Sequence, residues 1–343
     1  MAPGVGRNSP GTGKAGSRRP VVMVTGASAG VGRAVVREFA RHGADIGLIA
    51  RGREGLNGAA EDVRREGGRA LILPLDVADG RAVEDAAERL ESEFGPISIW
   101  INAAFVGMLS RFMDMTPEEF RRVTDVTYLG QVHGTRAALK RMLPRGEGSI
   151  VLVGSALAYR GIPLQSAYCG AKHAIQGFHD SVRSELFHDR SRVRISMVQL
   201  PGVNTPQFDW IRTNLPKKPK PASPPYQPEI AARAIRFAAL HNRKELWLAW
   251  PTWQAIVGDF LASSLLDRYL GAVGVSGQQD TEDVGPARKD NLFEPVDEDR
   301  GAHGRFDRVA RTSSPQFWLA THAVFSAAAL LILLLALVWL LLE

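Results

Sequence analysis

The sequence is poor in cysteine, and this scarcity excludes a fold held together by disulfide bonds. Cys169 is the only cysteine in 343 residues, so no disulfide can form within the chain. A reducing compartment is compatible with that count. The histidines His133, His173, His179 and His188 have no metal-ligand spacing with acids or with the cysteine, so we predict no metal site.

The sequence also lacks an internal repeat and a basic stripe with interleaved aromatic residues. The composition, 45% apolar and 23% charged, is that of an ordinary globular protein, which excludes a collagen-like or mostly disordered chain. Much of the net charge of +6 lies in the first twenty residues, so we predict no nucleic-acid partner. Residues 1–20 are rich in Gly, Pro and Ser and lack the apolar run of a secretory signal, which predicts a disordered arm.

One long hydrophobic run is present, at the C-terminus. Residues 323–342 carry no charge, and a helix of this length spans about 30 Å, the thickness of the hydrocarbon core of a bilayer. Trp318 and Trp339 lie near its two ends, where interfacial anchors are expected. The alternative is a buried core helix, which is usually shorter and has a polar face. We therefore expect a single-pass transmembrane tail anchor over 316–343.

Basic residues flank this run on its N-terminal side, at Arg300, Arg305, Arg308 and Arg311. The positive-inside bias then predicts a membrane protein whose catalytic domain is cytoplasmic. Residues 276–315 are polar and contain scattered Gly and Pro, which predicts a flexible tether between the globular part and the membrane.

Short apolar runs alternate with helix-like stretches over residues 21–250. Strands that are apolar throughout and alternate with helices indicate a parallel sheet covered on both faces. The sequence therefore predicts the α/β class, with a Rossmann-type doubly wound parallel sheet in a single domain. The runs expected to form strands are VVMVTG (21–26), ADIGLIA (44–50), LILPLDV (71–77), ISIWINA (97–103), GSIVLVGS (148–155) and VRISMVQLPG (193–202).

A glycine-rich turn, TGASAGVG at 25–32, follows the first run. Gly26 allows a tight turn, Gly30 lets backbone N–H groups approach a pyrophosphate, and Gly32 lets the helix pack on the strand. The helix that follows offers unpaired N–H groups and a positive dipole to the phosphates. Three glycines alone are also compatible with a simple turn, but their position after the first strand favours dinucleotide binding.

The end of the second run indicates which dinucleotide is bound. An acid there would bind the ribose 2′-hydroxyl of NAD, whereas an arginine suits the 2′-phosphate of NADP. The run ends at Arg51, and Asp45 lies at its other end. Arg51 and Arg53 are candidate partners of a phosphate, and Arg33 is a weaker one. We therefore expect NADP(H), with NAD(H) less favoured; the alternative for Arg51 is a solvated surface charge.

Tyr168 and Lys172 lie four residues apart at the start of a helical stretch, and Ser155 ends a predicted strand. Positions i and i+4 share a helix face, so the ammonium can lower the phenol pKa from its ordinary value of about 10. Such a tyrosine can exchange a proton with a carbonyl or alcohol oxygen, which the serine hydroxyl can hydrogen-bond. Standing alone, the pair would be compatible with a simple helix-surface contact.

Taken together with their neighbours, these residues resemble the short-chain dehydrogenase/reductase family over about residues 20–250. The matching motifs are TGASAGVG at 25–32, Asp76-Val77, Asn102-Ala103-Ala104, Ser155, Tyr168 with Lys172, and Pro201-Gly202-Val203-Asn204-Thr205. The resemblance implies that Ser155, Tyr168 and Lys172 are catalytic. It also implies that Lys172 binds the nicotinamide ribose, that Asp76 and Val77 lie by the adenine, that Asn102 lies by the adenine-side ribose, and that 201–205 line the nicotinamide. The predicted cofactor contacts are Gly26, Ser28, Gly30, Val31, Gly32, Arg51, Asp76, Val77, Asn102, Ala103, Tyr168, Lys172, Pro201, Gly202, Val203 and Thr205.

Two positions depart from the family pattern. Ala104 replaces the glycine of N-A-G and narrows the local backbone space by one methyl group. Thr127 replaces the asparagine of N-x-x-G, which in the family supports a water chain from the lysine to solvent. The threonine hydroxyl has a shorter reach, so we expect Thr127 to serve a slower or rerouted proton relay, and Thr127→Asn to retain or raise turnover.

Two segments after residue 205 leave alternatives open. The resemblance implies a substrate-covering lid at 215–228, which is proline-rich here and hence stiff. Residues 251–275 predict an amphipathic helical extension that packs on its own domain or on a second subunit, which leaves a homo-oligomer open. The alternative is a helix lying in the plane of a membrane.

Two functional hypotheses follow. The first is an NADP(H)-dependent oxidoreductase that transfers hydride between nicotinamide and a carbonyl or secondary alcohol of a lipophilic small molecule. Tyr168 is then the general acid or base, Lys172 modifies its pKa, and Ser155 stabilises the substrate oxygen. The second is a non-catalytic, dinucleotide-binding sensor or scaffold at the membrane. The departures at Thr127 and Ala104 favour the second, whereas the complete Ser-Tyr-Lys set favours the first.

Overall fold

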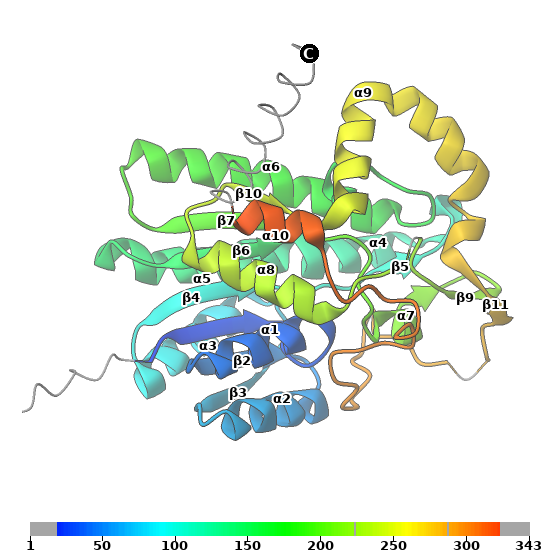
Figure 1. The fold of residues 1–343 in the computed structure, drawn as a ribbon. Helices are drawn as coiled ribbons and strands as arrows, with labels where there is room; N and C mark the ends of the chain where they lie inside the picture. Colours follow the sequence, from blue (N-terminus) through cyan, green and yellow to red (C-terminus); the bar gives the residue numbers. More distant parts are fainter. Residues whose placement is uncertain (1–18, 223, 287, 323–343) are drawn as a thin grey trace, which may run out of the picture.

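A seven-stranded parallel sheet forms the centre of the computed structural model, which describes residues 19–222, 224–286 and 288–322 (Figure 1). Its strands, in spatial order, are β3 (Ala70–Pro74), β2 (Asp45–Ala50), β1 (Val21–Thr25), β4 (Ile97–Asn102), β6 (Ser149–Val153), β7 (Arg194–Gln199) and β10 (Glu245–Trp247). The six apolar runs predicted from the sequence correspond to β1, β2, β3, β4, β6 and β7. The predicted α/β, Rossmann-type fold is therefore confirmed.

Helices cover both faces of this sheet. Those on the first face are α1 (Gly30–Arg41), α2 (Arg53–Arg65) and α8 (Pro228–Leu240). Those on the second face are α3 (Gly80–Phe94), α4 (Pro117–Thr124), α5 (Gly130–Arg145) and α6 (Ser166–His188). Each layer buries its own cluster of apolar side chains against the strands, as expected for a parallel sheet whose strands are apolar on both faces.

The direction of strand addition reverses between β1 and β4. From β1 the chain builds β2 and β3 on one side, then returns to build β4, β6, β7 and β10 on the other. The Thr25 hydroxyl joins the two strand ends, because it accepts hydrogen bonds from the backbone N–H groups of Ala103 (3.0 Å) and Ala104 (3.1 Å). In open α/β sheets such a reversal at the carboxyl ends of the strands is where ligands bind.

Short strands lie outside the main sheet. β5 (Met108–Leu109) pairs with β8 (Arg212–Thr213), and β9 (Lys217–Pro219) pairs with β11 (Gln279–Asp283). The four-residue helix α7 (Gln207–Trp210) precedes β8. Part of the proline-rich segment expected to be a lid is thus held by a strand from the C-terminal part of the chain.

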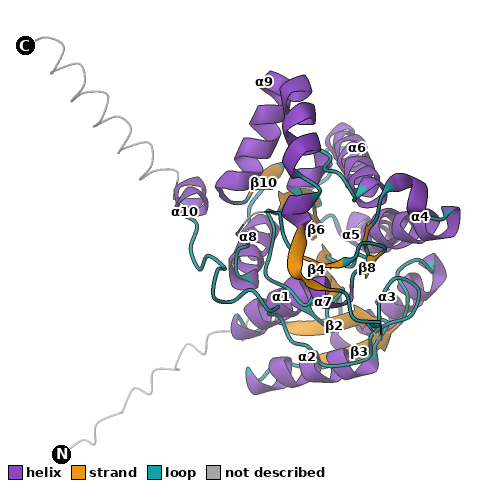
Figure 2. Ribbon diagram, turned by 90° about the vertical axis from the view of Figure 1, so that its right-hand side faces the viewer, coloured by secondary structure: helices purple, strands orange, loops and turns teal. Residues whose placement is uncertain are grey.

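The predicted extension is the helix α9 (Ala249–Val273), which is kinked at Ala262 and projects from the body as an arch (Figure 1, Figure 2). Arg160 bonds Asp259 before the kink (2.9 Å) and Asp267 after it, and so ties the two arms to the loop after β6. Both arms carry exposed apolar side chains. These are Trp250, Trp253, Val257, Phe260, Leu261, Leu265, Tyr269 and Val273.

The segment 276–315 differs from the flexible tether that the sequence predicted. Leu292 and Ala302 are buried in the two core clusters, and backbone hydrogen bonds join Gly30 N–H to Gly301 and Gln227 N–H to Arg311. The segment runs along the carboxyl ends of the strands before α10 (Pro315–Thr321) packs beside α8 and α9 (Figure 1). Its polarity misled the prediction, because some of its charged side chains pair with charges on the domain, as Asp290 does with Arg212 and Asp299 with Arg33. We call residues 290–301 the C-terminal strap.

Most of the predicted membrane anchor lies outside the residues that the structure describes. No helix within residues 19–222, 224–286 and 288–322 is long and apolar enough to cross a bilayer. The predicted membrane-spanning run, 323–342, lies outside these residues, as does most of the arm predicted over 1–20.

Candidate active site

The glycine turn lies between the end of β1 and the start of α1, and its backbone leaves no room for side chains. Gly26 has φ of +71°, and a Cβ there would lie 2.8 Å from the Cα of Ala104. A Cβ on Gly32 would lie 2.0 Å from the carbonyl oxygen of Gly26. The tight turn and the close helix–strand packing expected from the sequence are therefore both present.

A cavity of about 120 Å³ opens beside this turn. Among the predicted cofactor contacts, Gly26, Ser28, Arg51, Asp76 and Val77 line it. The turn, the end of β2 and the loop after β3 thus meet at one place, although they are far apart in the sequence. The lining also contains residues that sequence reasoning missed: Phe105, Val106, Trp210 and the strap residues Asn291 and 295–298.

Arg51, the predicted ligand of a 2′-phosphate, is held by the C-terminal strap. Its guanidinium donates to the backbone carbonyls of Phe293 (2.5 Å), Asn291 and Leu292. Burial, followed by repulsion from Arg122, lowers the pKa of Arg51. Arg122, which pairs with Asp76 and donates to Leu292 (3.0 Å), is a second cation at this end of the cleft that the sequence alone gave no reason to select.

Ser155, Tyr168 and Lys172 come together on the other side of the cleft. Ser155 follows β6, and its backbone N–H donates to the Gln199 side chain (2.7 Å) at the end of β7. Tyr168 and Lys172 share one face of α6, with the lysine Nζ 5.5 Å from the centroid of the phenol ring. Lys172 donates to the carbonyl of Val153 (2.7 Å), which fixes the ammonium against the same strand that ends at the serine.

Burial dominates the pKa values of the two titratable groups. It raises the pKa of the Tyr168 phenol, and a hydrogen bond with Ser155 opposes that rise. It lowers the pKa of Lys172 to about 7. This differs from the expected tuning, in which a charged lysine lowers the phenol pKa. The physical reason is that the lysine is itself taken out of water and loses much of its charge near neutral pH.

Phe105 is a neighbour of the catalytic set that sequence reasoning missed. Its ring meets the Tyr168 ring edge-on at 5.8 Å, and it lies 6.0 Å from Lys172 Nζ. Phe105 also lines the cavity, so it contacts both the cavity and the catalytic set. We call Ser155, Tyr168 and Lys172 the catalytic side of the cleft, and Arg33 and Arg51 the arginine side. Its position directly after the Asn102-Ala103-Ala104 motif was the signal that could have found it.

Two predicted residues have different partners in the structure. Thr127 is fully buried in the π-helical turn Asp125–Leu129, where its hydroxyl donates to the carbonyl of Val106 (2.7 Å) and accepts from the Val106 N–H (3.1 Å). The donor of the hydroxyl and one of its acceptor positions are therefore used to hold a loop, and the relay role of Thr127 stays a prediction. Asn102 is also fully buried, with its side chain bonded to Trp100 and Thr135, so it stabilises the strand end and does not line the cavity.

The residues predicted to line the nicotinamide lie across from the glycine turn. A Cβ on Gly30 would lie 3.1 Å from the Thr205 side chain, so this segment closes against the start of α1. The predicted contacts that do not line the cavity are Gly30, Val31, Gly32, Asn102, Ala103, Tyr168, Lys172, Pro201, Gly202, Val203 and Thr205. Most of these belong to the catalytic side or to the backbone frame of the turn.

The arrangement fits a pyridine dinucleotide. α1 begins at Gly30 without a side-chain cap, and its first N–H donates to an oxygen from outside the helix, the carbonyl of Gly301, so this helix end is suited to oxygen acceptors. The cavity beside it is lined by Arg51 and by Phe105, and Phe105 contacts Tyr168. A ligand with phosphates in its middle and a reactive ring at one end matches this set of groups.

Comparisons with known proteins agree with this geometry. Residues 20–215 match the family model described as short chain dehydrogenase. The chain is 31% identical over 276 residues to the "Uncharacterized oxidoreductase YxnA" of Bacillus subtilis, covering 80% of this chain and 78% of that protein. It is 40% identical over 252 residues to the "Probable oxidoreductase EphD" of Mycobacterium tuberculosis, covering 69% of this chain but only 42% of that longer protein.

Solved structures show the same fold. A short-chain dehydrogenase from Streptomyces avermitilis has a TM-score of 0.62 and 25% identity, covering 75% of this chain and 98% of that one. An alcohol dehydrogenase from Thermococcus sibiricus, complexed with 5-hydroxy-NADP, has a TM-score of 0.58 and 27% identity, covering 67% and 96%. The chain therefore belongs to the short-chain dehydrogenase/reductase family of NAD(P)-dependent oxidoreductases.

Proposed function

We propose that the protein is an NADP(H)-dependent oxidoreductase that interconverts a lipophilic carbonyl compound and its secondary alcohol. The observation that carries this proposal is the meeting of Ser155, Tyr168 and Lys172 next to Phe105, which lines the cavity. Arg51 at the other end of the cleft supports a 2′-phosphate on the cofactor.

The residues of the catalytic side have separate tasks. Tyr168 holds the proton that moves to or from the substrate oxygen at its phenol oxygen. Ser155 hydrogen-bonds the same substrate oxygen and stabilises charge that develops there. Lys172, held by its hydrogen bond to the Val153 carbonyl, is placed to hydrogen-bond a ribose hydroxyl. When the lysine is protonated, its positive charge favours the phenolate form of Tyr168. When bound, the nicotinamide supplies or accepts the hydride.

Cofactor choice and turnover test the enzyme proposal directly. The full chain in detergent micelles should bind NADPH more tightly than NADH, and should oxidise NADPH in the presence of some member of a panel of long-chain, steroidal or isoprenoid ketones. Binding of NADPH without turnover on any member of the panel would instead favour a dinucleotide-sensing protein. Preference for NADH would contradict the role of Arg51.

We further propose that the chain is anchored in a membrane by 316–343, with the enzyme domain on the cytoplasmic side. The support is the uncharged run 323–342, which begins directly after α10. The exposed apolar side chains of the α9 arch add to it, with Phe260 88% and Leu261 73% exposed. Because Arg160 ties this arch to the loop that follows Ser155, the arch lies close to the catalytic side. That placement supports a substrate taken from a bilayer.

Membrane association is tested by sedimentation of the full chain with phosphatidylcholine–phosphatidylglycerol vesicles. The wild type should stay with the vesicles after a carbonate wash. Leu334→Arg with Leu335→Arg should release it, since each charge at the centre of a bilayer costs about 2.5–3.5 kcal/mol on an insertion scale. Lys217→Leu with Lys218→Leu, two substitutions at lysines paired on β9, is the control and should leave the bound fraction unchanged. Retention of the doubly charged variant would contradict the anchor.

A further inference from the structure

We propose that the C-terminal strap, residues 290–301, is a built-in competitor of the dinucleotide, and that cofactor binding requires the strap to leave the cleft. The inference rests on the proposed function, because it takes the cleft to be the dinucleotide site. Contacts at three places support it. At each of them, an oxygen atom of the strap occupies a position that is suited to bind an anionic group of the cofactor.

The first contact is at the start of α1. The N–H of Gly30 donates to the carbonyl oxygen of Gly301 at 3.0 Å. This N–H belongs to the first turn of the helix that is expected to meet the pyrophosphate. Ala302, which directly follows the strap, is buried in the core cluster that contains α1. This burial holds the Gly301 carbonyl in place.

The second contact is at the start of α2, where a 2′-phosphate is expected. The N–H of Glu54 donates to the carboxylate of Asp297 at 2.9 Å, and the helix has no capping side chain of its own. The same carboxylate oxygen would lie 2.8 Å from a Cβ on Gly52, which shows how closely the strap approaches the turn after β2. Arg51, which lines the same cavity, donates its N–H groups to three strap carbonyls.

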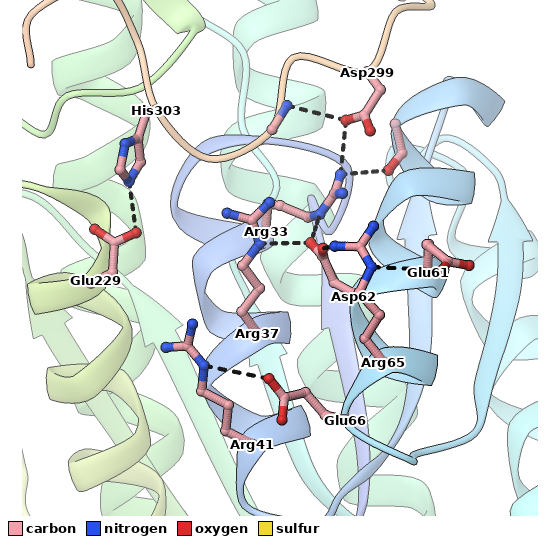
Figure 3. Close-up of polar contacts among 12 residues, drawn as sticks. Arg33, Arg37, Arg41, Glu61, Asp62, Arg65, Glu66, Glu229, Asp299 and His303 are labelled. Atoms are coloured by element: carbon pink, nitrogen blue, oxygen red, sulfur yellow. Dashed lines mark hydrogen bonds and ion pairs between the residues drawn. The ribbon is translucent and has the colours of Figure 1, made fainter.

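The third contact is an ion pair between Arg33 and the strap. Arg33 donates to Asp299 (2.9 Å) and to Asp62 (2.5 Å), and it is almost fully buried between the two (Figure 3). The strap carries five acids against one base. They are Asp290, Glu294, Asp297, Glu298, Asp299 and Arg300. An acidic segment seated on arginines has the charge pattern of a polyphosphate ligand, which the same arginines would attract.

The remaining space is too small for both occupants. The cavity left beside the strap measures about 120 Å³, whereas sites for drug-sized ligands are roughly 300–1,000 Å³. Leu292 of the strap is fully buried in the core cluster that contains Val77 and Val126. Strap and dinucleotide therefore exclude each other, and the apparent affinity for the cofactor falls with the fraction of molecules whose strap is open.

Binding of NADPH to full-length variants tests this competition. Asp297→Ala with Asp299→Ala removes two strap carboxylates and should tighten NADPH binding about tenfold, through a larger population of open molecules. Glu282→Ala with Asp283→Ala removes two carboxylates from β11 that pair with Lys218 and Lys217, and should leave the affinity unchanged. Affinity is read from energy transfer between protein tryptophan and NADPH. Equal or weaker binding by the strap variant would overturn the inference.

Hydrogen exchange on the wild-type chain gives a second test that needs no substitution. Saturating NADPH should speed exchange of the backbone amides in 290–301 while slowing it in the glycine turn. Slower exchange in the strap would mean that it closes over the cofactor, which contradicts competition. If neither the wild type nor the variant binds NADPH, the proposed function fails; if both bind it equally, only the strap inference fails.

Discussion

The two sides of the cleft are held in place by different kinds of contact. On the catalytic side, Ser155, Tyr168 and Lys172 lie within one β6–α6 unit. Lys172 is fixed by the Val153 carbonyl of β6, and Ser155 by the Gln199 side chain at the end of β7. On the arginine side, Arg51 is fixed by carbonyls of the strap, and Arg33 by Asp299 of the strap together with Asp62. A local unit therefore sets the chemistry, whereas a distant segment controls access to the cofactor end.

The largest expected effect is the loss of catalysis when only the catalytic side is altered. Tyr168→Phe removes the proton-carrying oxygen and should lower kcat by at least about a thousandfold, within the range of general acid–base and oxyanion effects combined. NADPH affinity should be nearly unchanged, because the arginine side is intact. Tyr269→Phe, on the exposed arch, is the control and should keep full turnover. Turnover by Tyr168→Phe at the wild-type rate would remove the basis for the assigned roles.

The next effect concerns the arginine side alone. Arg51→Ala should weaken NADPH binding by about ten- to a hundredfold, since hydrogen bonds to charged groups contribute about 1.5–3 kcal/mol. NADH binding should hold or improve, because the same substitution frees three strap carbonyls. Arg64→Ala, at an exposed arginine further along α2, should leave the ratio of the two affinities as in the wild type. A parallel loss for both cofactors would place the 2′-phosphate elsewhere.

A third prediction concerns stability and its dependence on pH. Lys172 has a pKa of about 7 in the folded chain and about 10.4 when unfolded. Between these values the unfolded state binds a proton that the folded state does not, so this lysine destabilises the fold progressively as the pH falls from 10 to 7. Lys172→Met should therefore raise Tm at pH 7, with a gain that shrinks towards pH 10. A pH-independent gain would mean that Lys172 is charged when folded.

The smallest expected effect is a change in stability on substitution of Thr127. Thr127→Val leaves the N–H and carbonyl of Val106 without their partner and should cost about 1–3 kcal/mol in the free energy of unfolding. Thr127→Ser should restore most of it, while Thr124→Val, whose hydroxyl only bonds back to its own helix, should cost less. Denaturant unfolding measures these differences. A neutral Thr127→Val that slows proton transfer would instead support the relay role.

The same contrast explains what the sequence could predict. The strands and the Ser-Tyr-Lys set follow from local patterns, because an apolar run or an i, i+4 spacing acts within one element. The partners of Arg51 could not be predicted, because pairing across more than two hundred residues leaves no periodic signal. The strap did contain a hint, since Leu292, Phe293 and Val296 interrupt an otherwise polar segment. The roles expected for Thr127 and Asn102 came from the family pattern, which does not specify the buried partners found here.

The long separation in sequence between Arg33 and Asp299 also affects the order of folding during synthesis of the chain. These two residues are 266 positions apart in the chain, and contacts between such distant residues are slow to form during folding. The sheet and the glycine turn are complete in the sequence well before the strap is synthesised. A nascent chain therefore exposes its phosphate-binding turn before the segment that later covers it has left the ribosome.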